Sequence, residues 1–283
     1  MEEKRNFDLL TLGQVLLRLS PPNNDRLVRG DTFVKQVGGA ELNVAVGVAL
    51  LGLRTGVISK LPSHDMGSFM KGKIRSYGVS DDFFMYDDSP SARVGIYYYE
   101  NGAYPRKPKV IYDRANSSFY SLKIDEIPEK AYTASRCFHT SGITLALSPK
   151  VRETTIEMIK RFKAAGTLVS FDVNFRGNLW TGEEAKECIE QILPYVDIFF
   201  CSEDTARLTF KKTGTAREMM KSFTEEYPIS IVASTQRIVH SPKSHTFGSI
   251  IYDARKDIYY EEEPYRDIDV VDRIGSGDAY ISG

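Results

Sequence analysis

Strand-like and helix-like segments alternate along this chain, and the alternation restricts its fold more than any other feature of the sequence. Short apolar and β-branched runs predict buried strands at 8–12, 55–60, 137–141, 168–173, 198–201 and 229–233. Helical periodicity predicts helices between them, at 41–51, 65–77, 149–165 and 183–193. Gly52 and Gly78 follow the first two helices, where glycine commonly ends a helix. The pattern predicts an α/β protein in which helices cover both faces of a mostly parallel sheet.

Two stretches interrupt this pattern. Residues 14–37 lack helical periodicity, and residues 92–113 hold β-branched and aromatic runs on either side of an Asn-Gly pair. Such a pair is a strong hairpin signal. We therefore expect a small antiparallel sheet, drawn from about 14–37 and 92–113 and inserted into the α/β body. Residues 247–260 are also hairpin-like, and no linker divides the chain, so residues 1–283 are expected to form one domain.

Composition excludes several classes of protein. The 283 residues carry 37 Lys+Arg against 38 Asp+Glu, so the basic excess of a nucleic-acid-binding protein is absent. The longest apolar run, 44–53, is only half of the roughly 20 residues that cross a bilayer, and the charged first residues are unlike a signal peptide. Cys137, Cys188 and Cys201 are far apart and form no CxxC pair, which fits a reducing cytoplasm. We expect a cytoplasmic protein that acts on neither nucleic acid nor membrane.

The first motif that carries chemistry is Gly38-Gly39-Ala40-Glu41-Leu42-Asn43. Two glycines before a predicted helix let the backbone approach a ligand closely. Asn43 would lie on the first turn of that helix, with an amide that can both donate and accept hydrogen bonds. Taken alone, the motif is more often a tight strand-to-helix turn.

The second motif runs from Asp272 to Asp278 and reads Asp-Arg-Ile-Gly-Ser-Gly-Asp. Consecutive backbone N–H groups of Gly275, Ser276 and Gly277, at the start of a predicted helix, would make a nest for an anion. Asp278 directly follows the nest and could take a proton from a hydroxyl that attacks phosphorus. Taken alone, the motif is equally well a glycine turn with a helix-start carboxylate.

In their order and spacing, the two motifs together resemble the two signatures of the ribokinase (PfkB) family of carbohydrate kinases. The resemblance extends over the whole chain. It implies a three-layer α/β/α sandwich whose small β-sheet is a lid over the sugar, with ATP and Mg²⁺ as cofactors. Two positions depart from the family pattern: Pro62 replaces a glycine of the first signature, and Arg273 replaces a small residue of the second.

Within the family, residues 95–97, 110–117 and 172–180 most resemble 2-keto-3-deoxygluconate kinases. That substrate is a sugar acid, and a guanidinium pairs with a carboxylate through two charge-assisted hydrogen bonds. The resemblance implies a common set of sugar-binding residues: Gly39, Asn43, Tyr97, Tyr112, Arg114 and Arg176. It also implies that Asp278 is the catalytic base and that the nest holds the moving phosphoryl group.

The predicted nucleotide side is less typical of the family. Most members carry an Asn, and a Glu three residues later, where this chain has Ser202 and Thr205. Glu203 and Asp204 lie between them and are expected on other faces, so the metal ligands stay open. Thr235 and Arg237 follow the next predicted strand and are expected near the nucleotide phosphates.

We expect ATP-dependent phosphorylation of the primary hydroxyl of 2-keto-3-deoxygluconate. One alternative is a fructokinase or a ribokinase, whose neutral substrates would not need Arg114 and Arg176. Another is a sugar-binding protein without efficient turnover, because the sequence stops five residues after Asp278, at Gly283, either by truncation or because further residues follow. A homodimer through the lid is also expected, since exposed edge strands invite pairing.

Overall fold

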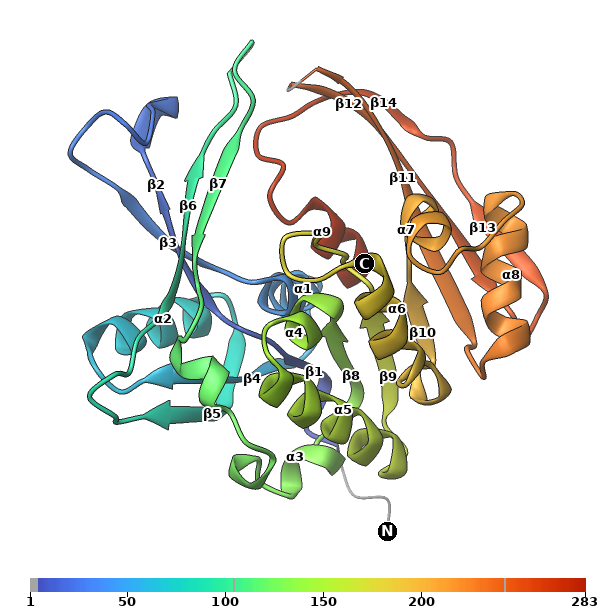
Figure 1. Ribbon diagram of the computed structural model, residues 1–283, viewed down its shortest axis with the longest axis horizontal. Coiled ribbons are helices and arrows are strands. Elements are labelled where there is room, and N and C mark those ends of the chain that lie inside the picture. Colours follow the sequence, from blue (N-terminus) through green and yellow to red (C-terminus); the bar gives the residue numbers. More distant parts are fainter. Residues whose placement is uncertain (1–4, 104, 242) are drawn as a thin grey trace.

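The computed structural model describes residues 5–103, 105–241 and 243–283 (Figure 1). The charged N-terminal segment, interpreted above as unlike a signal peptide, lies in part outside the described residues, as does residue 104 of the expected lid. Among the described residues, no helix combines the length and the apolar character needed to cross a membrane. Cys137, Cys188 and Cys201 are all free thiols, so the absence of disulfides among them agrees with the prediction.

The main sheet has ten strands, and it contains the predicted parallel core. From one edge to the other, the order is β13 (Ile258–Glu261), β12 (Ser244–Asp253), β11 (Ile231–Ser241), β10 (Ile198–Phe200), β9 (Leu168–Asp172), β8 (Ser135–Ser141), β1 (Phe7–Leu12), β4 (Thr55–Pro62) and β5 (Val79–Asp87). Seven neighbouring strands of this order run parallel: β11, β10, β9, β8, β1, β4 and β5. Strand β12 is antiparallel to β11, β13 and β14 (Tyr265–Asp269), which confirms the hairpin expected at 247–260.

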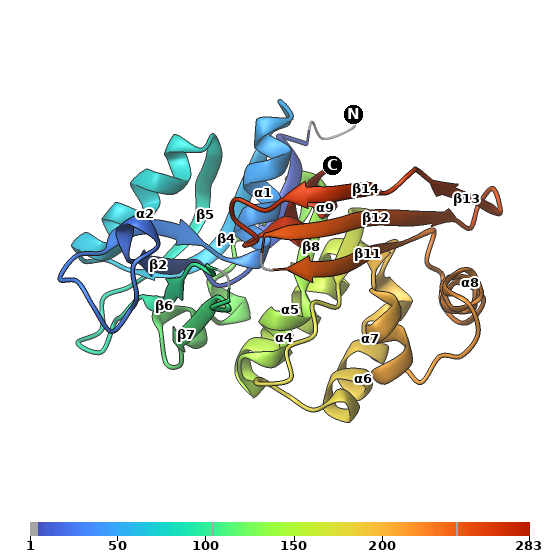
Figure 2. The same cartoon turned by 90° about the horizontal axis from the view of Figure 1, so that it is seen from above.

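Helices cover both faces of this sheet, which makes the predicted three layers. They are α1 (Ala40–Leu50), α2 (Asp65–Ser76), α3 (Lys130–Thr133), α4 (Gly142–Ala146), α5 (Pro149–Ala164), α6 (Gly182–Glu190), α7 (Glu203–Leu208), α8 (Ala216–Glu226) and α9 (Ser276–Ser282). Figure 2 shows α1 and α2 on one side of the sheet and α5 and α6 on the other. Short 3₁₀ turns lie at Pro22–Asn24, Ser118–Ser121, Ile124–Glu126 and Leu193–Tyr195.

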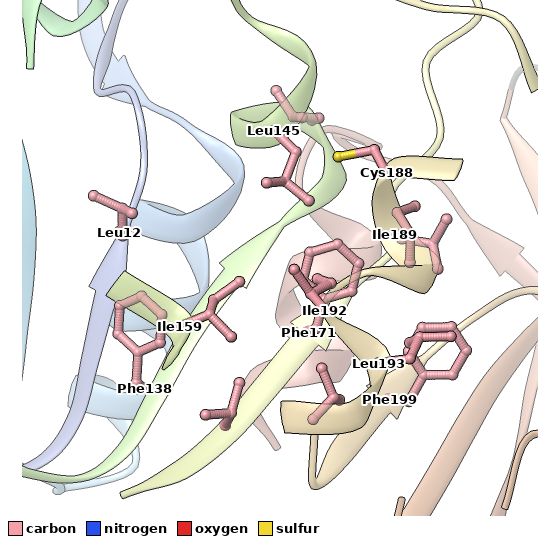
Figure 3. Close-up of a cluster of buried hydrophobic side chains, with 14 of the residues drawn as sticks. Leu12, Phe138, Leu145, Ile159, Phe171, Cys188, Ile189, Ile192, Leu193 and Phe199 are labelled. Carbon is pink, nitrogen blue, oxygen red and sulfur yellow. The ribbon is translucent and has the colours of Figure 1, made fainter. Parts of the chain in front are cut away.

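The core lies between the central strands and the helices that follow them (Figure 3). Phe138 of β8 stacks on Phe162 of α5 with ring centroids 4.0 Å apart, and both side chains are fully buried. Residues at the start of α5 explain why this helix begins where it does. Ser148 caps α5 by accepting a bond from Val151 N, and Pro149 occupies the first turn, where its missing N–H costs nothing.

The small sheet is separate from the main one and has the order β3 (Val34–Gly38), β2 (Leu16–Ser20), β6 (Gly95–Glu100) and β7 (Lys109–Asp113). Its outer pairs are antiparallel, as expected, whereas its central pair, β2 with β6, is parallel. The physical reason is that β2 and β6 continue from β1 and β5, two strands that run in the same direction. Figure 1 shows this sheet standing above the main sheet, opposite β11 and β12.

Strand β11 differs from the prediction. The sequence indicated a strand that ends at Ala233, but β11 continues to Ser241. The extension exists because β12 pairs with it antiparallel from Ile231 to Ser241, which gives its backbone groups hydrogen-bond partners. Thr235 and Arg237 therefore lie within a strand and not in a loop after one.

Candidate active site

A cavity of about 560 Å³ lies between the small sheet, the carboxyl ends of the parallel strands and the strands β11 and β12. The carboxyl edge of such a sheet is where α/β proteins usually bind ligands. The cavity is lined by every site residue proposed from the sequence, namely Gly39, Asn43, Tyr97, Tyr112, Arg114, Arg176, Ser202, Thr235, Arg237, Gly275, Ser276, Gly277 and Asp278. Segments from both ends of the chain thus form one cavity.

The two sequence motifs meet at the packing of α1 against α9. Asn43 Nδ2 donates a hydrogen bond of 2.7 Å to Asp278 Oδ2. The helices approach closely because Gly47 has no side chain: a Cβ there would lie 2.2 Å from Ser282 Oγ. Ile281 packs against Val44 on the same interface. Asp278 is thereby held from both helices.

Gly39 needs its glycine for two reasons. Its φ of +144° is a conformation that L side chains rarely adopt, and an added Cβ would lie 2.6 Å from the carbonyl oxygen of Gln14. The backbone of the first motif therefore lies against the segment between β1 and β2. The backbone of Gly39 thus lies close to the backbone of Gln14, and it also lines the cavity, where the sequence predicted a close approach to a ligand.

Three carboxyl groups line the cavity: that of Glu41 is buried, and those of Asp172 and Asp278 are partly buried. Burial raises the pKa of Asp278 to about 6, although the Asn43 hydrogen bond opposes the rise. Burial, and then the charge of Asp278, raise the pKa of Asp172 to about 7. Burial also raises the pKa of Glu41, against the bonds that its Oε1 accepts from Ser141 (2.6 Å) and Thr144 (2.7 Å). The cavity thus holds carboxyl groups that take up protons more readily than ordinary ones.

The small sheet supplies one wall of the cavity. Tyr97 and Tyr112 face each other across β6 and β7 with ring centroids 6.0 Å apart, and the Arg114 guanidinium lies 5.4 Å from the Tyr112 ring centroid. Tyr97 is buried, which raises its pKa to about 12 and keeps its hydroxyl protonated at neutral pH. Arg176 follows β9 and is exposed, and its own bond is to Phe175 O at 3.2 Å.

The segment before Gly275 contacts the small sheet through Asp272 and Ile274. Asp272, the first residue of the second motif, forms an ion pair of 3.0 Å with Arg18 of β2 and so links this motif to the small sheet. Ile274 packs against Leu16, Tyr97 and Tyr99. In the nest itself, Gly275 has φ of +78°, and Ser276 N makes a long bond of 3.5 Å to Arg273 O.

On the nucleotide side, one expectation is wrong. Asp204 was expected to point away, but it lines the cavity, as does Thr205. Because α7 begins at Glu203, its first turn carries these residues toward the cavity, while Glu203 pairs with Arg207 at 2.7 Å. Ser202 caps α7: its Oγ accepts from Thr205 N and donates to Thr205 Oγ1 at 2.9 Å.

Comparison with known proteins identifies the family. The family model for pfkB family carbohydrate kinases matches residues 6–283. The chain belongs to the pfkB family of carbohydrate kinases. The family and the fold inferred from the two motifs are thereby confirmed, and the protein is a sugar kinase.

Its relatives include kinases named for keto-deoxy sugar acids. The chain is 34% identical over 274 residues to the 2-dehydro-3-deoxygalactonokinase of Haloferax volcanii, a match that covers 97% of this chain and 82% of the relative. It is 26% identical over 281 residues to the 5-dehydro-2-deoxygluconokinase of Listeria monocytogenes, covering 99% and 82%. The crystal structure of the 2-dehydro-3-deoxygluconokinase of Thermotoga maritima superimposes with a TM-score of 0.91 at 31% identity, covering 98% of this chain and 85% of that one.

The other residues that line the cavity of this pfkB kinase include four to which sequence reasoning gave no role there: Gln14, Glu41, Asp172 and Arg273. Asp172 closes a buried strand at the carboxyl edge of the sheet, which is a signal that could have found it. Glu41 lies inside the first motif but reads as an ordinary helix-start acid. Gln14 is indistinguishable from a loop residue in the sequence, because its partners lie 100 residues away or more.

The raised pKa of Asp172 predicts a pH-dependent effect on stability. A carboxyl group whose folded pKa is raised stabilises the fold at low pH and loses that contribution as the pH rises through the folded value, here about 7. Asp172→Asn keeps an acceptor for Asn174 N but removes the ionisation. In the ligand-free protein we expect its melting temperature to rise by roughly 4–8 °C at pH 8. The rise should be smaller at pH 5, which lies inside the interval from the unfolded pKa of 3.8 to the folded pKa of about 7, and it should vanish below pH 3.8.

The matched control for this measurement is Asp257→Asn. Hydrogen bonds from Tyr252 and Lys221 hold the pKa of this exposed carboxyl below its ordinary value, so its removal is expected to lower the melting temperature slightly at pH 8 or leave it unchanged. Calorimetry across pH 5–8 checks both variants. A melting temperature that rises equally at both pH values would contradict the ionisation argument for Asp172.

Proposed function

We propose that this kinase transfers a phosphoryl group from ATP to the primary hydroxyl of a 2-keto-3-deoxy sugar acid, 2-keto-3-deoxygluconate. The observation that carries the proposal is that Arg114 and Arg176 line the same cavity as Asp278. Two cations in the sugar half of the site favour a substrate that ends in a carboxylate. The names of the Haloferax and Thermotoga relatives support the same class of substrate.

The sugar end of the site offers distinct partners for the two halves of such a molecule. Arg114 and Arg176 would pair with the carboxylate, and Tyr97 and Tyr112 would cover the sugar face and bond its hydroxyls. At the other end, Gly39 and Asn43 bring backbone and amide groups beside Asp278. The substrate would thus be held at its carboxylate while its primary hydroxyl reaches the carboxyl group of Asp278.

Asp278 is the proposed base. As the hydroxyl oxygen bonds to the γ-phosphorus, the bond from that phosphorus to the β,γ-bridging oxygen breaks, ADP leaves, and the hydroxyl proton passes to Asp278. The amides of Gly275, Ser276 and Gly277 would stabilise charge on the moving group. Asn43 orients the carboxylate through the 2.7 Å bond, which leaves its other oxygen for the substrate.

The nucleotide would lie along Ser202, Thr235 and Arg237. Burial, and then the charge of Arg273, lower the pKa of Arg237, so two cations face this part of the cavity and suit a polyphosphate. Mg²⁺ usually takes only one or two protein carboxylates and fills its remaining positions with water and phosphate oxygens. The carboxyl groups of Asp172 and Asp204, which line the cavity, fit that demand. Bound Mg²⁺ would neutralise charge on the phosphates.

The two sheets are proposed to act as one functional unit, because the cavity takes lining residues from both.

The free edges of the small sheet support a homodimer. All five residues of the edge strand β7 are exposed, and they include Val110 and Ile111. Exposed apolar edge strands favour pairing with another chain, so a second copy of this chain is the proposed occupant.

The substrate proposal predicts a preference for acids. We expect turnover with 2-keto-3-deoxygluconate or its C4 epimer, 2-keto-3-deoxygalactonate, and little with fructose or ribose, in an assay that couples ADP formation to NADH oxidation. Arg176→Ala should weaken sugar-acid binding about 10–100-fold, because a charged hydrogen bond is lost, with little effect on a neutral sugar. Arg255→Ala, an exposed arginine outside the cavity, is the control. Equal turnover of fructose would favour the fructokinase alternative.

The proposed base predicts a specific kinetic change. Asp278→Asn should lower kcat by about 10²-fold or more with little change in the KM for sugar, because proton acceptance occurs only in the transition state. Since the pKa of Asp278 is raised to about 6, wild-type kcat/KM should fall as the pH drops below about 6. Asp257→Asn should leave kcat unchanged. Wild-type kcat in the Asp278 variant would eliminate it as the base.

The dimer proposal is tested at β7. We expect light scattering at micromolar concentration to give twice the mass of one chain, and Ile111→Lys to give monomers, because a charge is placed on the paired edge. Ile258→Lys is a closely matched control, since Ile258 lies on the edge strand β13 and is 44% exposed against 43% for Ile111. Monomeric wild-type protein would refute the contact.

A further inference from the structure

Gln14 is a buried polar residue that contacts the arginine proposed to bind the sugar acid. It lies between β1 and β2, it is only 3% exposed, and it lines the cavity. Its Oε1 accepts a bond of 2.7 Å from Arg114 Nε. Its Nε2 donates to the backbone oxygen of Arg114 (3.1 Å) and to Ser117 Oγ (2.6 Å). One side chain thus holds both the guanidinium and the main chain of the residue.

The surrounding chain is shaped to admit Gln14. At Gly95, the first residue of β6, an added Cβ would lie 2.8 Å from Gln14 Nε2. At Gly39, an added Cβ would lie 2.6 Å from Gln14 O. A buried amide is costly unless its groups are paired, and here the oxygen and the nitrogen of the side chain both have partners. The residue is therefore part of a packed network and not a loop residue that happens to point inward.

The contact determines which donors Arg114 can offer. A guanidinium has one N–H on Nε and two on each Nη, and a carboxylate can bind either along the Nε side or across the two Nη groups. Gln14 occupies the Nε–H. In the part of the chain that the structure describes, no protein acceptor takes a bond from either Nη atom. Only the pairing across the two Nη groups is left for a ligand.

We propose that Gln14 is a positioning residue for acid specificity: by holding Arg114 at Nε, it directs the two Nη groups into the cavity as a bidentate donor pair for the substrate carboxylate. This inference rests on the proposed function, in which Arg114 binds the carboxylate. It adds the residue that sets the angle of that pairing. The bonds of Gln14 to Arg114 and Ser117 also hold the segment after β7 against the loop after β1.

The test compares Gln14→Leu, Arg114→Ala and the double variant, each as the full chain. Leucine is close in size but can neither accept from Nε nor donate to Ser117. The substrates are 2-keto-3-deoxygluconate and its C1 amide, which lacks the carboxylate charge. For Gln14→Leu we expect the KM for the acid to rise about 5–20-fold, with kcat and the KM for the amide changed less than about twofold. In the Arg114→Ala background, Gln14→Leu should have no further effect on the acid.

Thr155→Val is the control for the loss of a buried hydrogen bond. Thr155 is fully buried in α5, bonds Val151 O at 2.7 Å and does not line the cavity, so both KM values should stay at the wild-type level. Equal losses for acid and amide in Gln14→Leu would overturn the proposal, since that pattern is general damage to the cavity. A further loss in the double variant, beyond that of Arg114→Ala, would overturn it as well.

A measurement without substrate separates this inference from the proposed function. The ¹⁵N–¹H signal of Arg114 Nε, assigned by its disappearance in Arg114→Ala, should shift and exchange faster with water in Gln14→Leu. An unchanged signal would overturn the role of Gln14 alone. A wild-type enzyme that binds the amide as tightly as the acid would instead overturn the proposed function, whatever the signal does.

Discussion

The hydrogen bond from Asn43 to Asp278 joins residues that are 235 positions apart, and the active cavity depends on it. It can form only because α9 packs against α1 at Gly47, where any larger residue would collide with Ser282. That packing brings Gly275, Ser276 and Gly277 into the same cavity as Asp172 and Phe200 at the carboxyl ends of β9 and β10. The two sequence motifs thus share one interface, and a change at Gly47 would affect both.

The cavity is lined by charges of both signs. Carboxyl groups of Glu41, Asp172 and Asp278 line it together with Arg114, Arg176, Arg237 and Arg273, and Arg176 lies near enough to Asp172 and Asp278 to oppose the rise of their pKa values. Burying charge is unfavourable, so the carboxyl groups respond with raised pKa values and the guanidinium of Arg114 with a lowered one. Bound anions would relieve this cost at the arginines. The charged groups of the cavity therefore make the folded protein less stable than apolar groups would, but they are the groups that can bind ligands.

The small sheet connects the proposed sugar-binding residues to the segment that precedes Gly275. It carries Tyr97 and Tyr112, its strand β7 leads into Arg114, and its strand β2 carries Arg18, which pairs with Asp272 just before the nest. A movement of this sheet would therefore be transmitted to the loop that is proposed to hold the phosphoryl group. The inner face is tied to the site, while the exposed edge of β7 is available for the second chain proposed there.

Local periodicity predicted the layers and many of the strand and helix positions. The two motifs, and the resemblance to the pfkB family that they carry, led to thirteen of the residues that line the cavity, but not to Gln14, Glu41, Asp172 or Arg273. Short elements were missed or misplaced, such as α7 and the outer half of β11, whose pairing with β12 gives no local signal. Asp204 was misplaced because it lies in the first turn of α7, a helix of six residues that the sequence did not predict. The contacts of Gln14, the raised pKa of Asp172 and the Arg18–Asp272 pair were decided only by the tertiary structure. They depend on burial and on groups that lie far apart in the chain, and no sequence pattern encodes either.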